Sequence, residues 1–411
     1  MKFQKSNPLH YLIYSLSFLI YIICIFIKFF SVKRKNKTIT LTGHKLIGNL
    51  EVLFNKQNQE NLVMNYITFN YQDYLDLKMF YKKEGLEANI LYVLKPLDVY
   101  KCLSSNLIIA SHGIFFHKLI TKYLKIKTLY CGHAIEGAYP IEEDNKLFKD
   151  LQNYSEVWMY SDFEKDMFIK DFKYPYKNLK VNGYPRVQYL LENGNKQNAL
   201  KNINNINNKI VLYAPTASRN DKDFLNSTFS PFRLENLKKL DEFFKKLNTT
   251  LIIKTHLNDK FSLEVENYFE NSTFIKHTKN VIVDYDYDFL IMSDMLITDY
   301  STIYVDYLVL DKPIIFIAPP DPNKNRQYSK VIENSDIHRV MTFESLLSII
   351  EYELSSINES KETVILKNLI FNDLSINKVL DNSFEAIKKL IWYIFKNCDT
   401  WVFLKQKKIQ I

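Results

Sequence analysis

Glycine and cysteine are both scarce in this sequence. Only 8 of the 411 residues are glycine, so the glycine-rich loops that cradle phosphates in many nucleotide-binding proteins must be rare. No two cysteines form a Cys-x-x-Cys pair, which argues against a zinc site and against a disulfide framework. Such wide spacing fits a protein of the reducing cytoplasm. The four cysteines are Cys24, Cys102, Cys131 and Cys398.

Composition and charge narrow the class of protein. Hydrophobic residues make up 47% of the chain and charged residues 24%, which is typical of a globular protein with two or three domains. The formal net charge of +8 favours anionic partners such as nucleotides, phosphorylated substrates or anionic lipids, although a lysine-rich proteome would give the same surplus. The positive charge is spread along the chain without a recognition motif, so we expect no nucleic-acid partner.

Residues 11–30 form a long apolar run whose single charge is Lys28. A run of about 20 apolar residues is just long enough to cross a bilayer. It is too long for the apolar core of a signal peptide, and no small-residue cleavage site follows it. Basic flanks stay in the cytoplasm, so we expect a transmembrane helix with the body of the protein on the cytoplasmic side. An interfacial helix lying on the inner leaflet is the alternative. The basic flank consists of Lys33, Arg34, Lys35 and Lys37.

Apolar runs alternate with helical patterns along the rest of the chain. Residues 106–114 and 126–135 resemble strands that end in polar turns, and residues 153–172 resemble a strand followed by an amphipathic helix. Residues 231–248 resemble a second amphipathic helix. Alternation of this kind predicts parallel sheets covered by helices. We therefore expect an α/β fold with two Rossmann-like domains facing a cleft. The expected segments are a membrane anchor (1–37), an N-terminal Rossmann-like domain (38–190), an Asn-rich linker (191–209), a C-terminal Rossmann-like domain (210–380) and a helical tail (381–411).

The strongest local signal for function lies in residues 294–320. A short apolar strand ends at Thr298 and is followed by a polar cluster at the start of a helix. Hydroxyl groups there cap a helix, and the helix end also attracts phosphate. In open α/β sheets, ligands bind at the carboxyl ends of the strands. The residues of interest are Asp299, Tyr300, Ser301, Thr302 and Asp306, for which a plain helix cap is the alternative reading.

Three other predicted strands end in residues suited to phosphate chemistry. One ends in Thr216, Ser218 and Arg219, a second in Lys254 and His256, and a third in His133. Arginine and lysine neutralise phosphate charge, and histidine is suited to act as a general base. Each residue alone has a structural explanation, such as a hydrogen-bonded core histidine. Their recurrence at successive strand ends points to a common site.

These residues resemble the CDP-glycerol glycerophosphotransferases, the family of the teichoic-acid primases and polymerases. The resemblance covers roughly residues 100–335, and its five blocks occur in the order and spacing of the family. The hallmark block has a Thr-Asp-Tyr-Ser core, a downstream Asp, and Lys-Pro before the next strand. The five blocks are LYCGHAIEG (129–137), VNGYPRVQYLL (181–191), IVLYAPTASR (210–219), LIIKTHL (251–257) and LITDYSTIYVDYLVLDKPIIF (296–316).

The resemblance implies a GT-B-like enzyme that holds CDP mainly in its C-terminal domain. It implies that His133 is the base and that His256 also takes part in catalysis. The family has Trp-His-Gly where this chain has Cys131-Gly132-His133, so His112, in a Ser-His-Gly sequence, is a rival base. Leu257 also replaces the family's proline. The residues expected to bind the CDP-polyol are Arg186, Thr216, Arg219, Lys254, Asp299, Tyr300, Ser301, Thr302 and Asp306.

The expected reaction is attack of an acceptor hydroxyl on the β-phosphorus of a CDP-polyol, CDP-glycerol in the first place, with release of CMP. The acceptor would be a lipid-linked or polymeric teichoic-acid or capsular glycan. We expect no cofactor besides the donor and no bound metal, and we interpret the alternating Asp284, Asp286 and Asp288 as a solvated loop. Two alternatives stay open: a GT-B glycosyltransferase that uses a nucleotide sugar, and a non-catalytic, membrane-anchored module that binds polyanions.

Overall fold

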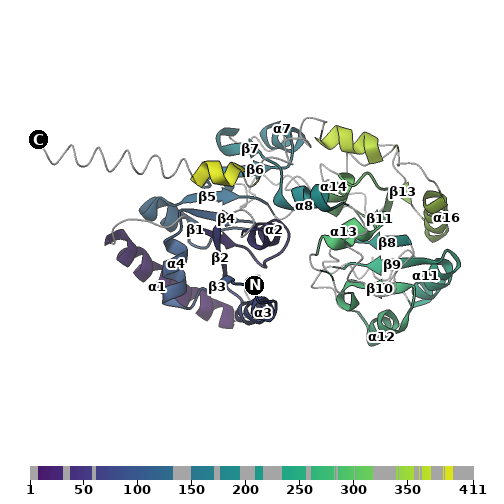
Figure 1. The fold of residues 1–411 in the computed structure, drawn as a ribbon, viewed down its shortest axis with the longest axis horizontal. Helices are drawn as coiled ribbons and strands as arrows, with labels where there is room; N and C mark the ends of the chain where they lie inside the picture. The colour runs from purple at the N-terminus through teal and green to yellow at the C-terminus, as the bar shows by residue number, and fades with distance from the viewer. Residues whose placement is uncertain are drawn as a thin grey trace, which may run out of the picture. The chain divides into compact units, whose positions relative to one another are not determined.

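The computed structural model shows an α/β protein built from two compact units (Figure 1). Unit 1 contains strands β1 to β7, and unit 2 contains β8 to β13; the boundary falls inside helix α8, after Gln188. The two units are described one at a time. The residues that the structure describes are 8–30, 38–57, 62–132, 150–170, 176–194, 209–215, 234–255, 261–281, 283, 286–299, 301–317, 339–340, 342–355, 361, 363–371, 383 and 385–391.

Unit 1 is organised around a seven-stranded sheet in the order β3-β2-β1-β4-β5-β6-β7, with every neighbouring pair parallel. Its central strands are buried on both faces, as in a parallel sheet covered by helices. All four residues of β4 are buried, for example. The strands are β1 (Thr38–Thr42), β2 (Val63–Thr68), β3 (Asn89–Tyr92), β4 (Leu107–Ala110), β5 (Lys127–Tyr130), β6 (Glu156–Met159) and β7 (Leu179–Val181).

Helices α3 and α4 of unit 1 begin at residues that are typical of helix starts. The side chain of Asn70 caps α3 by accepting a hydrogen bond from the backbone N–H of Gln72 at 3.0 Å, and a proline stands in the first turn of α4. The helices are α1 (Pro8–Phe30), α2 (Asn49–Asn55), α3 (Tyr71–Lys83), α4 (Pro96–Leu103), α5 (His117–Leu119), the π-helix η1 (Ile120–Leu124), α7 (Asp162–Lys170), the 3₁₀ turn η3 (Tyr176–Asn178) and α8 (Pro185–Asn193).

Unit 2 repeats the same plan with a six-stranded parallel sheet in the order β10-β9-β8-β11-β12-β13. The strands are β8 (Lys209–Tyr213), β9 (Thr249–Ile253), β10 (Ile275–His277), β11 (Met295–Thr298), β12 (Ile314–Ile317) and β13 (Arg339–Val340). The helices are α11 (Leu234–Lys246), α12 (Leu263–Asn271), the 3₁₀ turn η5 (Thr278–Asn280), α13 (Asp288–Met292), α14 (Ile303–Leu308) and α16 (Phe343–Ser355).

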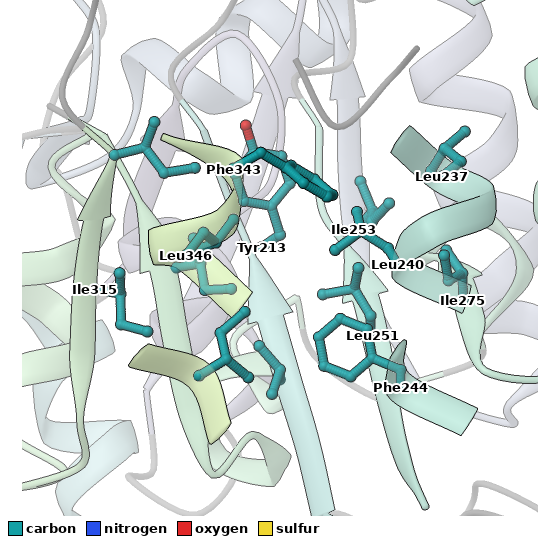
Figure 2. Close-up of a cluster of buried hydrophobic side chains, with 14 of the residues drawn as sticks. Tyr213, Leu237, Leu240, Phe244, Leu251, Ile253, Ile275, Ile315, Phe343 and Leu346 are labelled. Carbon is teal, nitrogen blue, oxygen red and sulfur yellow. The ribbon is translucent and has the colours of Figure 1, made fainter. Parts of the chain in front are cut away.

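The core of unit 2 lies between this sheet and helices α11 and α16 (Figure 2). Leu237, Leu240 and Phe244 follow one face of α11 at spacings of three and four residues, and all three are buried against the sheet. The amphipathic pattern of residues 231–248 predicted this helix. Helix α11 thus packs directly on the sheet of unit 2. The carboxyl edge of this sheet carries the candidate site.

Both sheets reverse their strand order once, between β1 and β4 in unit 1 and between β8 and β11 in unit 2. The first six strands of each sheet therefore follow the Rossmann order, in which strands three, two and one precede strands four, five and six. The α/β class with two Rossmann-like sheets is confirmed. The expected domain boundaries stay predictions, and residues 195–208 of the expected linker lie outside the described residues.

Candidate functional site

The point of strand reversal in unit 2 places the Thr298-Asp299 segment beside the end of β8. The Thr298 hydroxyl donates a hydrogen bond to the Ala214 carbonyl at 2.6 Å, and the Ala214 N–H donates to the Ile297 carbonyl at 2.9 Å. Ala214, the first residue after β8, is therefore still hydrogen-bonded to the end of β11. Because ligands of open α/β sheets bind where the strand order reverses, this edge is the candidate nucleotide site.

The segment after β11 turns tightly before α14 begins. Asp299 Oδ1 accepts a hydrogen bond from the Ser301 N–H at 2.9 Å, which forms an Asx-type turn. Thr302 is the residue before α14, but its side chain makes no capping hydrogen bond, so the predicted hydroxyl cap is wrong for Thr302. The Ser301 and Thr302 side chains are partly exposed. This polar turn at the strand end therefore remains accessible to a ligand.

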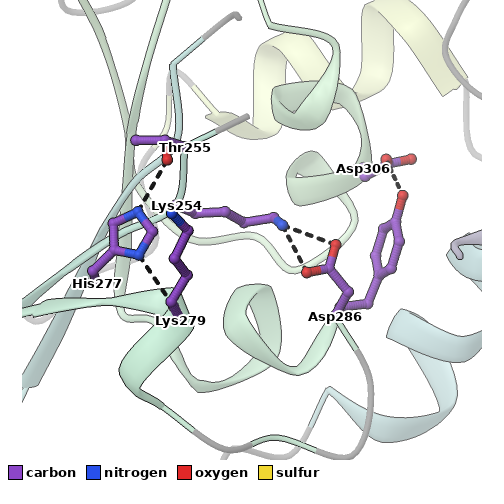
Figure 3. A network of polar contacts seen from close by, with 7 residues as sticks. Lys254, Thr255, His277, Lys279, Asp286 and Asp306 are labelled. Carbon is purple, nitrogen blue, oxygen red and sulfur yellow. Dashed lines mark hydrogen bonds and ion pairs between the residues drawn. The ribbon is translucent and has the colours of Figure 1, made fainter. Parts of the chain in front are cut away.

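Lys254 follows β9 and is held at the same edge of the sheet. Its N–H donates to the Tyr213 carbonyl at 2.8 Å, and its ammonium group lies 2.7 and 2.8 Å from the two carboxylate oxygens of Asp286 (Figure 3). The Lys254 side chain is 21% exposed and that of Asp286 is 41% exposed. The pair thus fixes a cation at the carboxyl edge of the sheet while leaving it within reach of solvent.

The loop of alternating aspartates is more than the solvated loop that the sequence suggested. Besides the contact of Asp286 with Lys254, Tyr287 donates from its hydroxyl to Asp306 Oδ2 at 3.3 Å (Figure 3). Asp288 is buried and accepts a 2.6 Å hydrogen bond from the Tyr189 hydroxyl. The interpretation as a solvated loop is therefore wrong for Asp288, which is buried. Asp286 is partly exposed but paired with Lys254, and Asp284 lies outside the described residues.

A buried histidine that the sequence did not single out supports the end of β9. His277 accepts a hydrogen bond from the Lys279 N–H at Nδ1 (3.1 Å), so its neutral ring carries the proton on Nε2. Nε2 lies 3.0 Å from the Thr255 hydroxyl and donates to it (Figure 3). His277 therefore holds the residue that directly precedes His256 in the chain.

At the carboxyl edge of unit 1, Asn49 joins three segments of the chain. Its amide nitrogen donates to the carbonyls of Cys131 and Gly132 at 2.6 and 2.9 Å, and its Oδ1 accepts from the Arg186 N–H at 3.1 Å. Asn49 is buried. The residues that precede His133 are therefore tied to the start of α8, where Arg186 is located.

Arg186 is fully buried, and its guanidinium lies 4.7 Å from the centre of the Tyr184 ring. The neighbouring Cys131 is buried as well. Burial raises the pKa of the Cys131 thiol to about 12, against the opposing effect of the Arg186 charge. Cys131 is consequently a neutral thiol at physiological pH and is not an activated nucleophile.

Two imidazoles meet where the strand order of unit 1 reverses. His112 follows β4, and its Nδ1 lies 2.9 Å from the Ser111 hydroxyl. His44 follows β1, and the centres of the two histidine rings are 4.2 Å apart. A side chain at Gly43 would bring its Cβ within 2.6 Å of the Ser111 Oγ, which explains the glycine beside this pair. His112 was the rival base in the sequence, whereas His44 was missed.

The predicted site residues are thus distributed over both units. The residues at the carboxyl edge of unit 2 are Lys254, Asp299, Ser301, Thr302 and Asp306, and Arg186 belongs to unit 1. The predicted residues His133, Thr216, Arg219, His256 and Tyr300 lie outside the described residues. Within the part of the chain that is described, no group of three His, Cys, Asp or Glu side chains is arranged to hold a metal ion.

Curated relatives share the sequence over part of their length. The chain is 26% identical to the teichoic acid glycerol-phosphate primase of Bacillus subtilis (strain 168) over 244 residues, which is 56% of this chain and 59% of that protein. It is 23% identical to the teichoic acid ribitol-phosphate polymerase TarL of Staphylococcus aureus over 317 residues, covering 71% of this chain and 51% of the relative. The chain thus spans about half to six tenths of the length of these two relatives.

Solved structures support the fold. The wall teichoic acid polymerase TagF superposes with a TM-score of 0.64 at 16% identity, covering 95% of this chain and 94% of that one. This likeness confirms the GT-B-like class. The family model for CDP-Glycerol:Poly(glycerophosphate) glycerophosphotransferase matches residues 32–385. The chain therefore belongs to the CDP-glycerol:poly(glycerophosphate) glycerophosphotransferase family.

Proposed function

We propose that this protein transfers a polyol phosphate, glycerol phosphate in the first place, from a CDP-polyol to a hydroxyl of a teichoic-acid or other surface-glycan acceptor. One observation carries the proposal: the Thr-Asp-Tyr-Ser block lies within the family match, and its described residues stand where the strand order of unit 2 reverses. The names of the relatives, glycerol-phosphate primase and ribitol-phosphate polymerase, agree with a polyol phosphate as the transferred group. No cofactor besides the donor is part of the proposal.

The donor diphosphate would bind at the carboxyl edge of unit 2. Lys254 supplies a fixed positive charge there, and the turn at Asp299–Ser301 supplies hydroxyl and backbone groups. Fixed charges of this kind act strongly on phosphoryl groups because they need not reorganise during the reaction. Further donor contacts are assigned to Arg186, Thr216, Arg219, Tyr300, Thr302 and Asp306 by their place in the family motifs.

In the proposed reaction, an acceptor hydroxyl attacks the β-phosphorus of the donor. A new bond forms between the hydroxyl oxygen and that phosphorus, the bond to the bridging oxygen breaks, and CMP leaves with the electron pair. His133 takes the hydroxyl proton, with His112 as the rival base, and His256 stabilises charge on the diphosphate. Asn49 and His277 act as positioning residues, because they hold residues 131–132 and Thr255 next to these histidines in the chain.

We further propose that the protein works at a bacterial cytoplasmic membrane, with its catalytic body on the cytoplasmic side and a lipid-linked or polymeric glycan as acceptor. Helix α1 has a mean hydropathy of 2.3 over its most apolar stretch and is long enough to cross a bilayer. The basic residues 33–37 follow it in the sequence and favour the cytoplasmic face.

A donor panel tests the reaction. Purified full-length protein in acceptor-containing membranes would be incubated with CDP-glycerol, CDP-ribitol, UDP-sugars and GDP-sugars, and the released nucleotide and the mass of the acceptor product would be measured. We expect CMP release from a CDP-polyol and a mass increase of one or more polyol-phosphate units. Release of UDP or GDP alone would instead establish a glycosyltransferase. If no donor is consumed and His256→Ala leaves glycan binding unchanged, the protein is a binding module.

A further inference from the structure

Two imidazoles lie together at the carboxyl edge of the unit 1 sheet. Thr42 and Ala110 are the last residues of β1 and β4, and they are paired in register. His44 and His112 each follow two residues later, so the two chains leave the sheet side by side. The ring centres are 4.2 Å apart, and the angle between the ring planes is 49°. Because the strand order reverses between β1 and β4, this is the position at which an open α/β sheet binds a ligand.

The backbone around this histidine pair is held in place by small residues. The Ser111 N–H donates to the Thr42 carbonyl at 3.3 Å, so hydrogen bonding between the two chains continues past the strand ends. Gly43 leaves room for this contact, because a Cβ there would lie 2.6 Å from Ser111 Oγ. Ser111 is buried, and its hydroxyl lies 2.9 Å from His112 Nδ1, which orients that ring and turns Nε2 away from Ser111. The pair is therefore positioned by the sheet.

The histidine pair is accessible from solvent. His44 is exposed, and His112 is partly exposed. A Cβ on Gly113, which follows His112, would meet no heavy atom of the described residues within 4 Å. There is therefore space for a bound group next to His112.

The segments around the histidine pair carry positive charge and no negative charge. Residues 38–50 and 99–132 contain no Asp or Glu, and the acidic residue nearest to His44 in the sequence is Glu51. Lys45 follows His44 and is exposed. Two protonated imidazoles at this distance repel each other, and an anion that contacts both offsets the repulsion. Phosphate is well suited to this place, because its oxygens accept charge-assisted hydrogen bonds from imidazole N–H groups.

The histidine pair has too few ligands for a metal centre. Neutral imidazoles bind transition metals, but zinc sites in proteins have three or four protein ligands. Among the residues that the structure describes, no third His, Cys, Asp or Glu side chain joins these two in a metal-binding arrangement. The chemistry of the pair therefore favours an anion.

The strand beside β4 leads to the predicted base. The Cys131 N–H donates to the Ala110 carbonyl at 2.9 Å, so residues 131–132 leave the sheet one strand away from the histidine pair. Neighbouring strands are about 4.8 Å apart. A substrate that reaches the end of β5 is therefore also within reach of the pair. The diphosphate of the donor, in contrast, is assigned to unit 2.

We propose that His44 and His112 bind a phosphate group that the acceptor carries next to its attacking hydroxyl. The ring N–H groups of the two histidines would donate to the phosphate oxygens, and Lys45 would add positive charge nearby. The identity of the bound molecule as the acceptor rests on the proposed function, whereas the phosphate site itself does not. His133 is then the base, and His112 has a binding role.

Histidine NMR tests phosphate binding without turnover. Full-length protein labelled with ¹³C and ¹⁵N in histidine would be titrated at pH 6 with glycerol 3-phosphate, and with glycerol as the neutral control. Both ring signals, assigned through His44→Gln and His112→Gln, should shift with glycerol 3-phosphate alone. His44→Gln should weaken the affinity read from the His112 signal about tenfold, the effect of one charge-assisted hydrogen bond. His44→Lys keeps the charge and should stay within about threefold of the parent protein.

Lys127→Gln is the matched control for this titration, because it removes an exposed positive charge from the amino end of β5, at the opposite edge of the same sheet. Its affinity for glycerol 3-phosphate should equal that of the parent protein. If neither ring signal shifts in the parent protein, or if Lys127→Gln weakens binding as much as His44→Gln, the proposal is wrong whatever reaction the enzyme catalyses.

Kinetics distinguish the acceptor from the donor. Two soluble glycans would be compared as acceptors, one with a glycerol phosphate at its acceptor end and one without it. His44→Gln should raise the KM for the phosphorylated glycan about tenfold and leave the KM for CDP-glycerol within about twofold. Equal effects on both glycans, a rise in the donor KM alone, or a loss of kcat in His112→Gln at unchanged acceptor KM would overturn the assignment. Shifts of both ring signals without any transfer by the parent protein would instead refute the proposed reaction and leave the phosphate site established.

Discussion

The three hydrogen bonds of Asn49 allow the positioning role of this residue to be tested. Asn49→Ala removes the donor to two carbonyls and the acceptor of the Arg186 N–H, all at a buried position. Each hydrogen bond contributes about 1 kcal/mol net, so the free energy of unfolding of unit 1 should fall by about 3 kcal/mol. The variant should also lose turnover, because residues 131–132 precede His133.

Asn49→Asp sharpens the test because it keeps the side-chain shape and changes its chemistry. A carboxylate still accepts from the Arg186 N–H, but it meets the Cys131 and Gly132 carbonyls with no proton to donate. At pH 8 this variant should therefore be less stable than Asn49→Ala. At pH 5 the difference should shrink, because a protonated carboxyl group regains one donor.

Trp158 offers a reporter for unit 1, since it is buried in β6. With Trp392→Phe and Trp401→Phe in the background, its fluorescence would follow urea unfolding. Asn271→Ala is the matched control, because Asn271 makes one exposed hydrogen bond within its own helix and should change stability by less than about 0.5 kcal/mol. If both Asn49 variants unfold like the parent protein, Asn49 does not hold these segments together.

Three further predictions concern other parts of the chain. Asp286→Asn should leave stability within about 1 kcal/mol, because its ion pair is partly exposed. Because Lys254 would no longer be held in place, the KM for the CDP-polyol should rise in a CMP-release assay. Burial lowers the pKa of His117 to about 4, below its unfolded value of about 6.5. The unfolded chain therefore binds the proton first, stability falls between about pH 6.5 and 4, and His117→Gln should flatten that dependence in urea titrations. Phe244→Ala should cost unit 2 about 3–5 kcal/mol in denaturant unfolding, whereas Phe243→Ala, at a partly buried position, should cost clearly less.

The order of elements could be predicted from the sequence because it depends on local patterns. The apolar run ending at Ala110 and the amphipathic residues 231–248 each identified one element, β4 and α11. The family blocks then identified Asp299 and Lys254 as residues at strand ends. Strand ends are predictable because apolar residues give way to polar ones where a buried parallel strand leaves the sheet.

The partners of these residues could not be predicted, because they are distant in the sequence. Lys254 and Asp286 are 32 positions apart, and Asn49 and Arg186 are 137 apart. Alternating aspartates in a polar stretch carry the same local pattern whether they are solvated or paired. Only the packing of the loop against β9 and α14 decides which carboxylate has a partner. The same holds for His44, which becomes a neighbour of His112 only because β1 and β4 are adjacent.

The two positioning residues suggest how this fold holds catalytic groups that follow strands. In each unit a buried side chain fixes the backbone or hydroxyl just before a predicted catalytic histidine: Asn49 fixes Gly132, and His277 fixes Thr255. Phosphoryl transfer depends mainly on placing groups and charges correctly. A displacement at either position would therefore reduce turnover without removing any group that contacts the substrate. Thr255→Val separates this role from simple folding, because it removes the bond to His277 while keeping the side-chain volume. Its kcat should fall while the free energy of unfolding of unit 2 drops by only about 1 kcal/mol, the net contribution of one hydrogen bond. Equal losses in Thr255→Val and Phe244→Ala on both measures would refute the positioning argument.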